Sequence, residues 1–260
     1  MTKIALVQMA ISRNQEKNRA AVLRWMKEAA QMGAELICFP EGALTGYLPK
    51  MGQPKAMAID DEVIKDIQKE AICLNLEVYI GASISCQGKI TNSYFQIADQ
   101  IDWVDKTHLG QREAQYFEAG QRIRCLQSRL GAIGTAICLE SHFPEIFTRC
   151  RDLGAVIMLL PFASPAVCGP RGKMWRKILP ARAYDNGMYV LATNLCGTDG
   201  DRYYSGGMMA VDPTGEILAE YEGPDDHMIL VDVDLDWVKK LRKANGKTNY
   251  FDRRKPELYR

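Results

Sequence analysis

Apolar and polar residues along the chain follow two periods, one typical of helices and one typical of strands. Apolar side chains at helical spacing, among them Trp25 and Ala29, predict an amphipathic helix over residues 14–32. Gly33 follows and is suited to close that helix, because glycine readily adopts the left-handed conformation found at helix ends. A short apolar run at residues 36–39 predicts a buried strand instead.

The same two patterns alternate along the rest of the chain. Helices are expected over residues 14–32, 60–74, 144–153, 173–186 and 235–243. Strands are expected over residues 3–9, 36–39, 78–84, 90–98, 122–126, 131–137, 156–160, 190–194, 208–211, 216–219 and 228–233. Alternating elements with added hairpins are typical of a layered α/β (α+β) protein. No linker rich in glycine, proline or serine divides the sequence, so a single domain over residues 1–260 is expected.

Two segments of similar sequence each follow a predicted helix. They are Gly33-Ala-Glu-Leu-Ile-Cys-Phe-Pro40 and Gly154-Ala-Val-Ile-Met-Leu-Leu-Pro161. Two generic helix–strand connections would produce the same pattern. The alternative is a pseudo-symmetric sandwich of two sheets, in which the strand ends at Pro40 and Pro161 border one site.

Composition limits the classes of partner. Of the 260 residues, 47% are hydrophobic and 25% are charged, which is ordinary for a globular protein. The formal net charge of +1 provides no electrostatic footprint for nucleic acid or a membrane surface, so neither partner is expected. No apolar run is long enough to span a bilayer, and no N-terminal signal pattern is present, so a cytoplasmic location is expected.

The eight cysteines include no C-x-x-C pair, so zinc-ribbon and thioredoxin-like sites have no support. In a reducing cytosol we expect free thiols, with Cys38 and Cys73 as packing residues and Cys168 exposed. With only three histidines, no metal site is expected, and no organic cofactor is required.

Cys138 occupies the most informative position. It follows the apolar run Gly131-Ala-Ile-Gly-Thr-Ala-Ile137 and precedes a turn into a helix that Pro144 is suited to begin. A thiol at such a bend is exposed to attack and has a lowered pKa near a helix N-terminus. Serine occupies the analogous nucleophile elbow of hydrolases. The alternative is a buried structural cysteine, which is common for this residue type.

Three other polar residues lie in segments suited to chemistry. Glu41 follows the buried strand at residues 36–39, where α/β proteins place functional groups, although a solvated loop glutamate would look the same. Lys106 lies between apolar residues and is either a desolvated lysine at an anionic centre or a snorkelling surface lysine. Glu113 is a second candidate carboxylate near the lysine.

Together with Cys138, these segments resemble the nitrilase superfamily of carbon–nitrogen hydrolases over nearly the whole chain. The matching segments are Ala5-Leu-Val-Gln8, F-P-E-x-x-x-x-G-Y at 39–47, D-K-x-H-L at 105–109, E-x-x-x-F-x-x-G at 113–120, I-C-x-E-x-x-F-P-E at 137–145, Pro180-Ala-Arg-Ala-Tyr-Asp-Asn-Gly187, Gly206-Gly207 and Asp252-Arg-Arg-Lys-Pro-Glu-Leu-Tyr259. A single match would be weak evidence, whereas their common order argues against chance.

The resemblance implies a Glu–Lys–Cys triad. Glu41 would be the general base, Lys106 the cationic stabiliser and Cys138 the nucleophile, with Glu113 supporting the lysine and the substrate. Lys106 and the backbone N–H of Leu139 would face the developing oxyanion. Tyr47 matches a position that lines the substrate pocket, although aromatic residues in such loops often only pack.

The resemblance further implies a four-layer α-β-β-α sandwich that forms a homodimer or a higher homo-oligomer. The C-terminal segment at residues 249–260 has little core of its own, so we expect an arm across a neighbouring subunit. Relatives that hydrolyse N-carbamoyl-D-amino acids carry arginines where this chain has Ser141 and His142. A substrate carboxylate is therefore not expected to be held there, and His142 is expected at the surface.

The resemblance favours hydrolysis of a small linear amide or N-carbamoyl compound with release of ammonia. Hydrolysis of a nitrile to a carboxylic acid would use the same triad. In a different class, Cys138 would be the reactive thiol of a non-hydrolytic redox sensor or binding protein. Such a sensor does not need Glu41 and Lys106 together, which argues against it.

Overall fold

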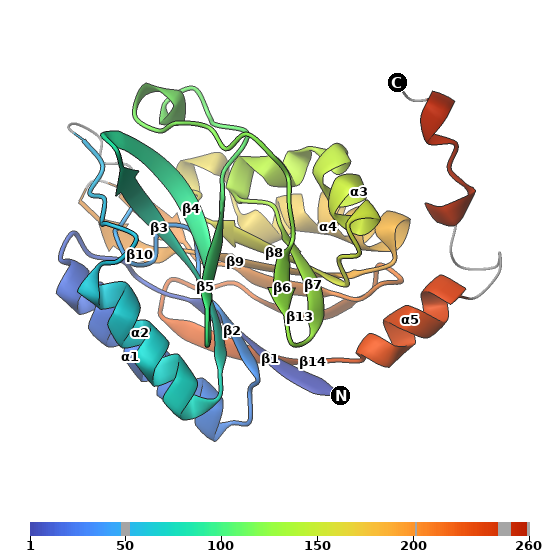
Figure 1. Ribbon diagram of the computed structural model, residues 1–260, viewed down its shortest axis with the longest axis horizontal. Helices are drawn as coiled ribbons and strands as arrows, with labels where there is room; N and C mark the ends of the chain where they lie inside the picture. The colour runs from blue at the N-terminus through green and yellow to red at the C-terminus, as the bar shows by residue number, and fades with distance from the viewer. Residues whose placement is uncertain (48–52, 201, 244–250, 259–260) are drawn as a thin grey trace.

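Two six-stranded sheets pack face to face, and helices cover the outer face of each sheet (Figure 1). The computed structural model describes all residues except 48–52, 201, 244–250 and 259–260. In spatial order, the first sheet contains β14 (His227–Val233), β1 (Thr2–Gln8), β2 (Leu36–Cys38), β3 (Glu77–Cys86), β4 (Lys89–Ile97) and β5 (Ile101–Asp105). The second contains β13 (Ile217–Tyr221), β12 (Met208–Val211), β9 (Tyr189–Asn194), β8 (Ile157–Phe162), β7 (Gly131–Thr135) and β6 (Leu126–Ser128).

The helices form the two outer layers. They are α1 (Gln15–Gln31) and α2 (Glu62–Leu74) on the first sheet, and α3 (Pro144–Asp152) and α4 (Arg171–Asn186) on the second. A further helix, α5 (Leu235–Lys243), follows β14. The helix predicted over residues 14–32 is α1, which begins after the N-cap Asn14, whose side chain accepts hydrogen bonds from two backbone N–H groups. As predicted, α3 has Pro144 in its first turn.

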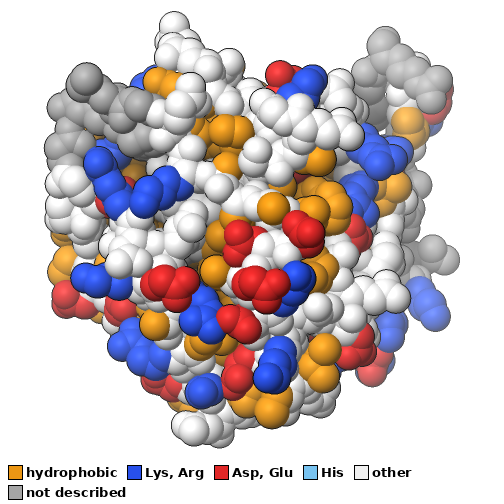
Figure 2. All heavy atoms as spheres, turned by 60° about the vertical axis from the view of Figure 1, so that its left-hand side comes forward, with side chains coloured by type: hydrophobic (Ala, Val, Ile, Leu, Met, Phe, Trp, Pro, Cys, Tyr) orange, Lys and Arg blue, Asp and Glu red, His pale blue; other side chains and the backbone are white. Residues whose placement is uncertain are grey.

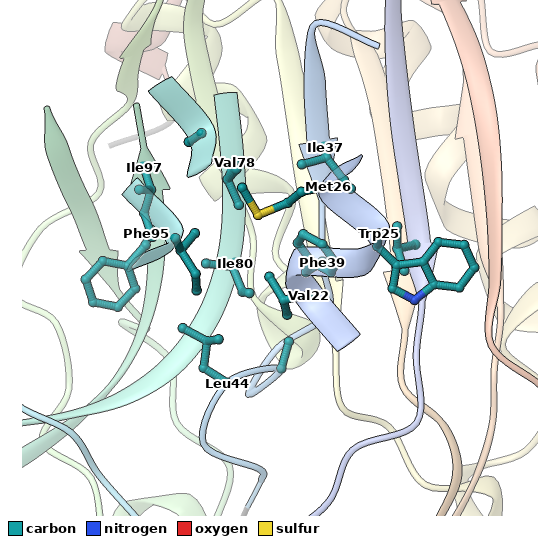
Figure 3. Packing of buried hydrophobic residues seen from close by; sticks show 14 of the residues in the cluster. Val22, Trp25, Met26, Ile37, Phe39, Leu44, Val78, Ile80, Phe95 and Ile97 are labelled. Carbon is teal, nitrogen blue, oxygen red and sulfur yellow. The ribbon is translucent and has the colours of Figure 1, made fainter. Parts of the chain in front are cut away.

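Side chains along the central strands alternate between two core clusters, because successive residues of a strand point to opposite faces of the sheet. Along β1, Ile4 and Leu6 pack between the two sheets, whereas Ala5 and Val7 pack toward α1 and α2. Figure 3 shows the outer cluster, in which Val22 and Met26 of α1 lie against residues of the first sheet such as Ile80. The strands of the second sheet alternate in the same way, so the predicted four-layer α-β-β-α sandwich is confirmed.

The second sheet repeats the topology of the first. In each half a β-α-β-α-β unit supplies three parallel strands, β1–β2–β3 in one and β7–β8–β9 in the other. Two antiparallel strands extend each unit on one side, and one antiparallel strand flanks it on the other. The two similar sequence segments lie at β2 and β8, the middle strands of the two units. The pseudo-symmetric sandwich is therefore the correct alternative.

Two expectations from the sequence pattern are wrong, and three strands were not predicted. Residues 122–125 form a connection between the two sheets rather than a strand. Backbone pairing begins only at Leu126, which pairs with Ile133. The half-buried edge strand β5 and the hairpin formed by β10 (Cys196–Asp199) and β11 (Arg202–Ser205) were not predicted, since polar residues interrupt their apolar pattern. Cys38 is buried as expected, but Cys73 lies on the exposed side of α2.

The C-terminal segment contains two short 3₁₀ turns, η4 (Phe251–Arg253) and η5 (Pro256–Leu258), which lie apart from the sheets in Figure 1. The Arg151 guanidinium stacks on the Phe251 ring at 4.6 Å and connects this segment to α3. Residues 249–250 and 259–260 of the expected arm lie outside the described part of the chain. On the face shown in Figure 2, acidic and basic side chains are mixed, in keeping with the formal net charge of +1.

Candidate active site

The carboxyl ends of β2 and β8, one from each half, meet at a buried carboxylate. Glu41 follows β2 and is 1% exposed. Its Oε2 atom accepts a hydrogen bond from the backbone N–H of Ala163, just past β8, at 2.8 Å. The chain turns sharply at Gly42, where φ is 68°, and a Cβ atom at Gly81 would lie 2.7 Å from the Glu41 Cα. Glycine at both positions therefore allows the loop that carries Glu41 to pack on β3.

Lys106 is the buried cation of the site. It follows β5 and is 1% exposed. Its Nζ atom lies 2.9 Å from Oε1 of Glu41 and 2.7 Å from Oε1 of Glu113. An ammonium group has three N–H donors, so one remains after these two bonds. A buried charge needs such partners, which excludes the snorkelling surface lysine.

Glu113 begins the 3₁₀ turn η1 (Glu113–Gln115) and is held on both oxygens. Oε1 accepts from Lys106, and Oε2 accepts from the backbone N–H of Gly110 at 2.8 Å. Asn92 of β4 joins the two glutamates, because its side-chain N–H donates to Glu41 at 2.7 Å and to Glu113 at 3.2 Å. Asn92 was not among the site residues predicted from the sequence. The signal available was a poor strand former within a predicted strand.

Cys138 lies at a sharp bend after β7, as predicted. Its φ is 53°, in the left-handed region that residues with a side chain rarely adopt, at a cost of about 1–3 kcal/mol. The 3₁₀ turn η2 (Cys138–His142) follows and leads into α3. The backbone N–H of the next residue, Leu139, donates to no carbonyl within the described part of the chain. The bend thus presents the thiol together with a free donor.

The expected lowering of the thiol pKa is wrong for this arrangement. Burial raises the pKa of Cys138 well above its ordinary value, and the negative charge of Glu41 adds to this, while Lys106 acts in the opposite direction. Burial likewise raises the pKa of Glu41 despite the adjacent ammonium group. For Lys106, burial alone would lower the pKa, but Glu41 and the other nearby anionic groups raise it. The resting site therefore holds a protonated thiol beside a carboxylate–ammonium cluster.

Glu140 connects the segment of the lysine to that of the thiol. Its Oε1 atom accepts from the Thr107 N–H at 2.7 Å, the Thr107 hydroxyl at 2.6 Å and the His108 N–H at 3.2 Å. Its Oε2 atom accepts from the Ile137 N–H at 2.8 Å, immediately before Cys138. No role for Glu140 was predicted from the sequence, whereas the structure places it between the segments that carry Lys106 and Cys138.

The remaining predicted residues lie around this cluster. Tyr47 packs against a buried cluster that includes Ala163. Burial raises the pKa of its hydroxyl, and the charges of Glu41 and Glu113 add to the effect. Leu139 is 36% exposed. Ser141 is buried, whereas His142 and Cys168 are exposed, as expected.

Within residues 1–47, 53–200, 202–243 and 251–258, no group of three or more His, Cys, Asp and Glu side chains is placed to hold a metal ion. None of the helices described is both long and apolar enough to cross a membrane. Cys138, Glu41 and Lys106 together offer a thiol that can act as a nucleophile, a carboxylate that can act as a base, and an ammonium group.

Comparison with known proteins gives a consistent picture. The family model described as carbon–nitrogen hydrolase matches residues 3–243. The deaminated glutathione amidase of Mus musculus is 27% identical, with 98% of this chain and 84% of the relative covered. Among solved structures, a carbon–nitrogen hydrolase from Helicobacter pylori G27 has a TM-score of 0.89 at 19% identity, covering 99% and 96% of the two chains. An amidase from Nesterenkonia sp. has a TM-score of 0.82 at 24% identity, covering 99% and 95%.

Proposed function

Because the chain belongs to the carbon–nitrogen hydrolase family, we propose that it hydrolyses the C–N bond of a small linear amide or N-carbamoyl compound and releases ammonia. The observation that carries this proposal is the buried Lys106 ammonium group, which is held between Glu41 and Glu113 beside the Cys138 thiol. Relatives named as amidases favour amide chemistry over nitrile chemistry.

In the first half of the proposed reaction, Cys138 attacks the carbonyl carbon while its proton moves to Glu41. A protonated thiol needs such a base, and the oxygen suited to it is Oε2, which accepts only the Ala163 N–H within the described residues. The oxyanion that forms would accept from the third N–H of Lys106 and from the Leu139 N–H. Collapse of this intermediate breaks the C–N bond, and Glu41 returns the proton to the departing ammonia.

In the second half, water hydrolyses the thioester. Glu41 takes a proton from the water as the oxygen attacks the carbonyl carbon, and the same two donors stabilise the second oxyanion. Collapse breaks the C–S bond, and the sulfur recovers its proton from Glu41. With an amide, the products are ammonia, a carboxylic acid and the free enzyme. With an N-carbamoyl compound, the acid is a carbamic acid, which loses carbon dioxide to leave an amine. Water is the only co-reactant.

The redox-sensor alternative conflicts with the electrostatics of the site. Oxidation of a cysteine to a sulfenic acid proceeds through the thiolate. Burial and Glu41 raise the pKa of Cys138, which disfavours the thiolate. A hydrolase is compatible with this state, because Glu41 removes the proton only during attack.

Ammonia release from a panel of amides, ureido acids and nitriles tests the proposal, with Cys138→Ala and Cys168→Ala as a matched pair of cysteine variants. We expect at least one amide or ureido compound to be hydrolysed by the wild type and by Cys168→Ala, but not by Cys138→Ala. If only nitriles are hydrolysed, the proposed activity is nitrile hydrolysis and not amide hydrolysis. Equal activity of the two variants would remove Cys138 from the mechanism.

We propose further that the chain acts in the cytoplasm as a homodimer or higher homo-oligomer. Exposed apolar side chains on and beside α3 and α4 support an interface there, among them Leu153 at 37% exposure and Tyr184 at 48%. Residues 249–260 would form an arm across the neighbouring subunit. Light scattering of the full chain, compared with a chain ending at residue 243, tests this proposal, and a monomeric full chain would contradict it.

A further inference from the structure

Asn194 is a fully buried polar residue at the carboxyl end of β9, and the reaction proposed above does not use it. Its side chain is 0% exposed. Its Oδ1 atom accepts from the Ser164 N–H at 2.9 Å, and its Nδ2 atom donates to the Ser164 carbonyl at 3.2 Å and to the Gly206 carbonyl at 3.0 Å. Both N–H donors of the amide are therefore paired. The side chain thus clamps the segment just past β8 to the turn before β12.

The repeated topology does not require a polar residue at this position. The pairing of the parallel strands, counted from Pro40 and Pro161, makes Ala82 of β3 the equivalent of Asn194. Ala82 is also 0% exposed, but its side chain has no polar atom. Burying an amide costs free energy unless the amide is paired. The buried amide of Asn194 is therefore explained by what it holds rather than by the topology.

The segment that Asn194 clamps carries the backbone N–H of Ala163. This N–H donates to Oε2 of Glu41 at 2.8 Å. It also faces the thiol, because burial raises the pKa of Cys138 while a hydrogen bond from the Ala163 N–H acts in the opposite direction. One backbone donor thus serves both the proposed base and the proposed nucleophile.

Ala163 is held on both sides by the end of β9. The carbonyl of the preceding residue, Phe162, accepts from the Leu195 N–H at 3.3 Å. The N–H of the following residue, Ser164, donates to the Asn194 side chain. The first of these is a bond between backbone groups, which any sequence could form. The second depends on a side chain, so Asn194 is the residue that decides how firmly Ala163 is held.

The clamp is anchored in the first half of the molecule. The Asn194 amide donates to the Gly206 carbonyl, and the next N–H along the chain, that of Gly207, donates to Oε1 of Gln8 at 2.7 Å. Gln8 ends β1, is 0% exposed, and donates to two further backbone carbonyls. Side chains whose own partners are fixed in this way provide the rigid support that a functional group needs.

We infer that Asn194 is a positioning residue, which holds the Ala163 N–H against both the Glu41 carboxylate and the Cys138 thiol. The inference rests on the proposed function, in which these two groups are the base and the nucleophile. As the sulfur attacks, its proton moves from Cys138 to Glu41, and the shared N–H keeps the two groups at the distance that this transfer needs. Without the clamp the donor moves away, and both the thiolate and the carboxylate lose a hydrogen bond that favours their charged forms.

The test measures the rate at which iodoacetamide alkylates Cys138, because this reaction proceeds through the thiolate and needs no substrate. Peptide mass spectrometry separates Cys138 from the exposed Cys73, Cys86 and Cys168. At one fixed pH, Asn194→Ala should slow the alkylation of Cys138 about 10-fold, which is the effect of a one-unit rise in the thiol pKa. Asn194→Ser, whose hydroxyl has one donor where the amide has two, should slow it less and serves if Asn194→Ala does not fold.

Thr193→Val, at the neighbouring residue of β9, is the matched control. Thr193 is 2% exposed, and its hydroxyl donates to the Val7 carbonyl of β1, so this variant loses a buried hydrogen bond to the first sheet. Urea unfolding should show a loss of stability in both variants, whereas only Asn194→Ala should slow alkylation. Equal slowing in both would mean that lost stability is the cause, and an unchanged or faster rate in Asn194→Ala would also overturn the inference.

Kinetics on an amide that the wild type hydrolyses give a second readout and separate the two proposals. Asn194→Ala should lower kcat about 10- to 100-fold and leave KM nearly unchanged, because it misplaces the reacting groups and not the substrate. If amides are hydrolysed and Asn194→Ala keeps the wild-type kcat and alkylation rate, the positioning role is wrong and the amidase proposal stands. If no amide is hydrolysed, the amidase proposal fails, and the alkylation rates still decide whether Asn194 positions the thiol.

Discussion

The two halves of the molecule share one topology but supply different chemistry to the site. The first half contributes charged side chains, Glu41, Lys106 and Glu113, from the ends of β2 and β5 and the turn after them. The second half contributes the Cys138 thiol and backbone N–H donors from residues that follow β7 and β8. Charge is thus concentrated in one half, while the proposed nucleophile and the neutral donors belong to the other.

The difference arises at equivalent strand ends. Counting from Pro40 and Pro161, Phe162 occupies the position of Glu41. Phe162 remains within β8 and packs on Trp175 with ring centres 4.9 Å apart, whereas the chain leaves β2 before Pro40 and turns back at Gly42. The repeated topology brings two strand ends to one point, and the local turn decides whether a side chain or a backbone donor faces the site.

The largest expected effect comes from removing charge in the first half without changing shape. Glu41→Gln should lower kcat at least about 1000-fold, because it removes the proposed base. Glu113→Gln should cost about 10- to 100-fold, since Lys106 keeps its bond to Glu41. Steady-state kinetics on the best amide substrate measures both. Equal losses would mean that the two carboxylates act as a pair, and the assignment of Glu41 as the single base would be wrong.

A second prediction compares strand glycines of the two halves. A Cβ atom at Gly81 would meet backbone atoms of the Glu41 loop, with Pro40 O at 2.8 Å. At Gly134 of β7 it would meet side chains of the outer layer, including Cys150 Cβ at 2.8 Å. Both alanine variants should lose about 1–3 kcal/mol of unfolding free energy in urea. Only Gly81→Ala should also lower kcat, by about 100-fold, because rigid backbone that carries Glu41 must move.

Much of the fold and of the candidate site can be predicted from the sequence, and the features that were missed have physical causes. The helices were predicted well because apolar faces and helix-end residues are local features, as at Trp25 and Pro144. Glu41, Lys106, Glu113 and Cys138 were singled out because each stands in a recognisable segment, and the structure brings the first three into contact. The interactions of Asn92 and Glu140 were missed because they join segments distant in sequence, such as Glu140 and Thr107. The lowered thiol pKa was wrong because desolvation depends on the surrounding fold, which the local helix-terminus pattern does not specify.

A third prediction concerns the Cys138 thiol in the second half and the pH dependence of the unfolding free energy. Since the folded pKa of Cys138 is raised above its ordinary value of 9.0, the stability contributed by the neutral thiol is present below pH 9.0 and is lost as the pH rises further. The unfolding free energy of the wild type relative to Cys138→Ser should therefore fall by about 1.4 kcal/mol per pH unit above that value. Urea unfolding across the alkaline range measures it. Cys168→Ser, which removes an exposed thiol, should keep the wild-type pH dependence, and a flat difference for Cys138→Ser would contradict the raised pKa of the Cys138 thiol.

The smallest expected effect tests the connection between the halves. Thr107→Val removes the hydroxyl bond to Glu140 but leaves the two backbone N–H bonds to the same oxygen. The loss should be about 1 kcal/mol of stability and a few-fold in kcat, because Lys106 and Cys138 are then less firmly positioned. Thr214→Val is the matched control, since the Thr214 hydroxyl donates to Asp212 at 2.7 Å in the turn between β12 and β13. It should lose similar stability with unchanged kcat. If both variants leave kcat unchanged, Glu140 stabilises the fold without positioning the site.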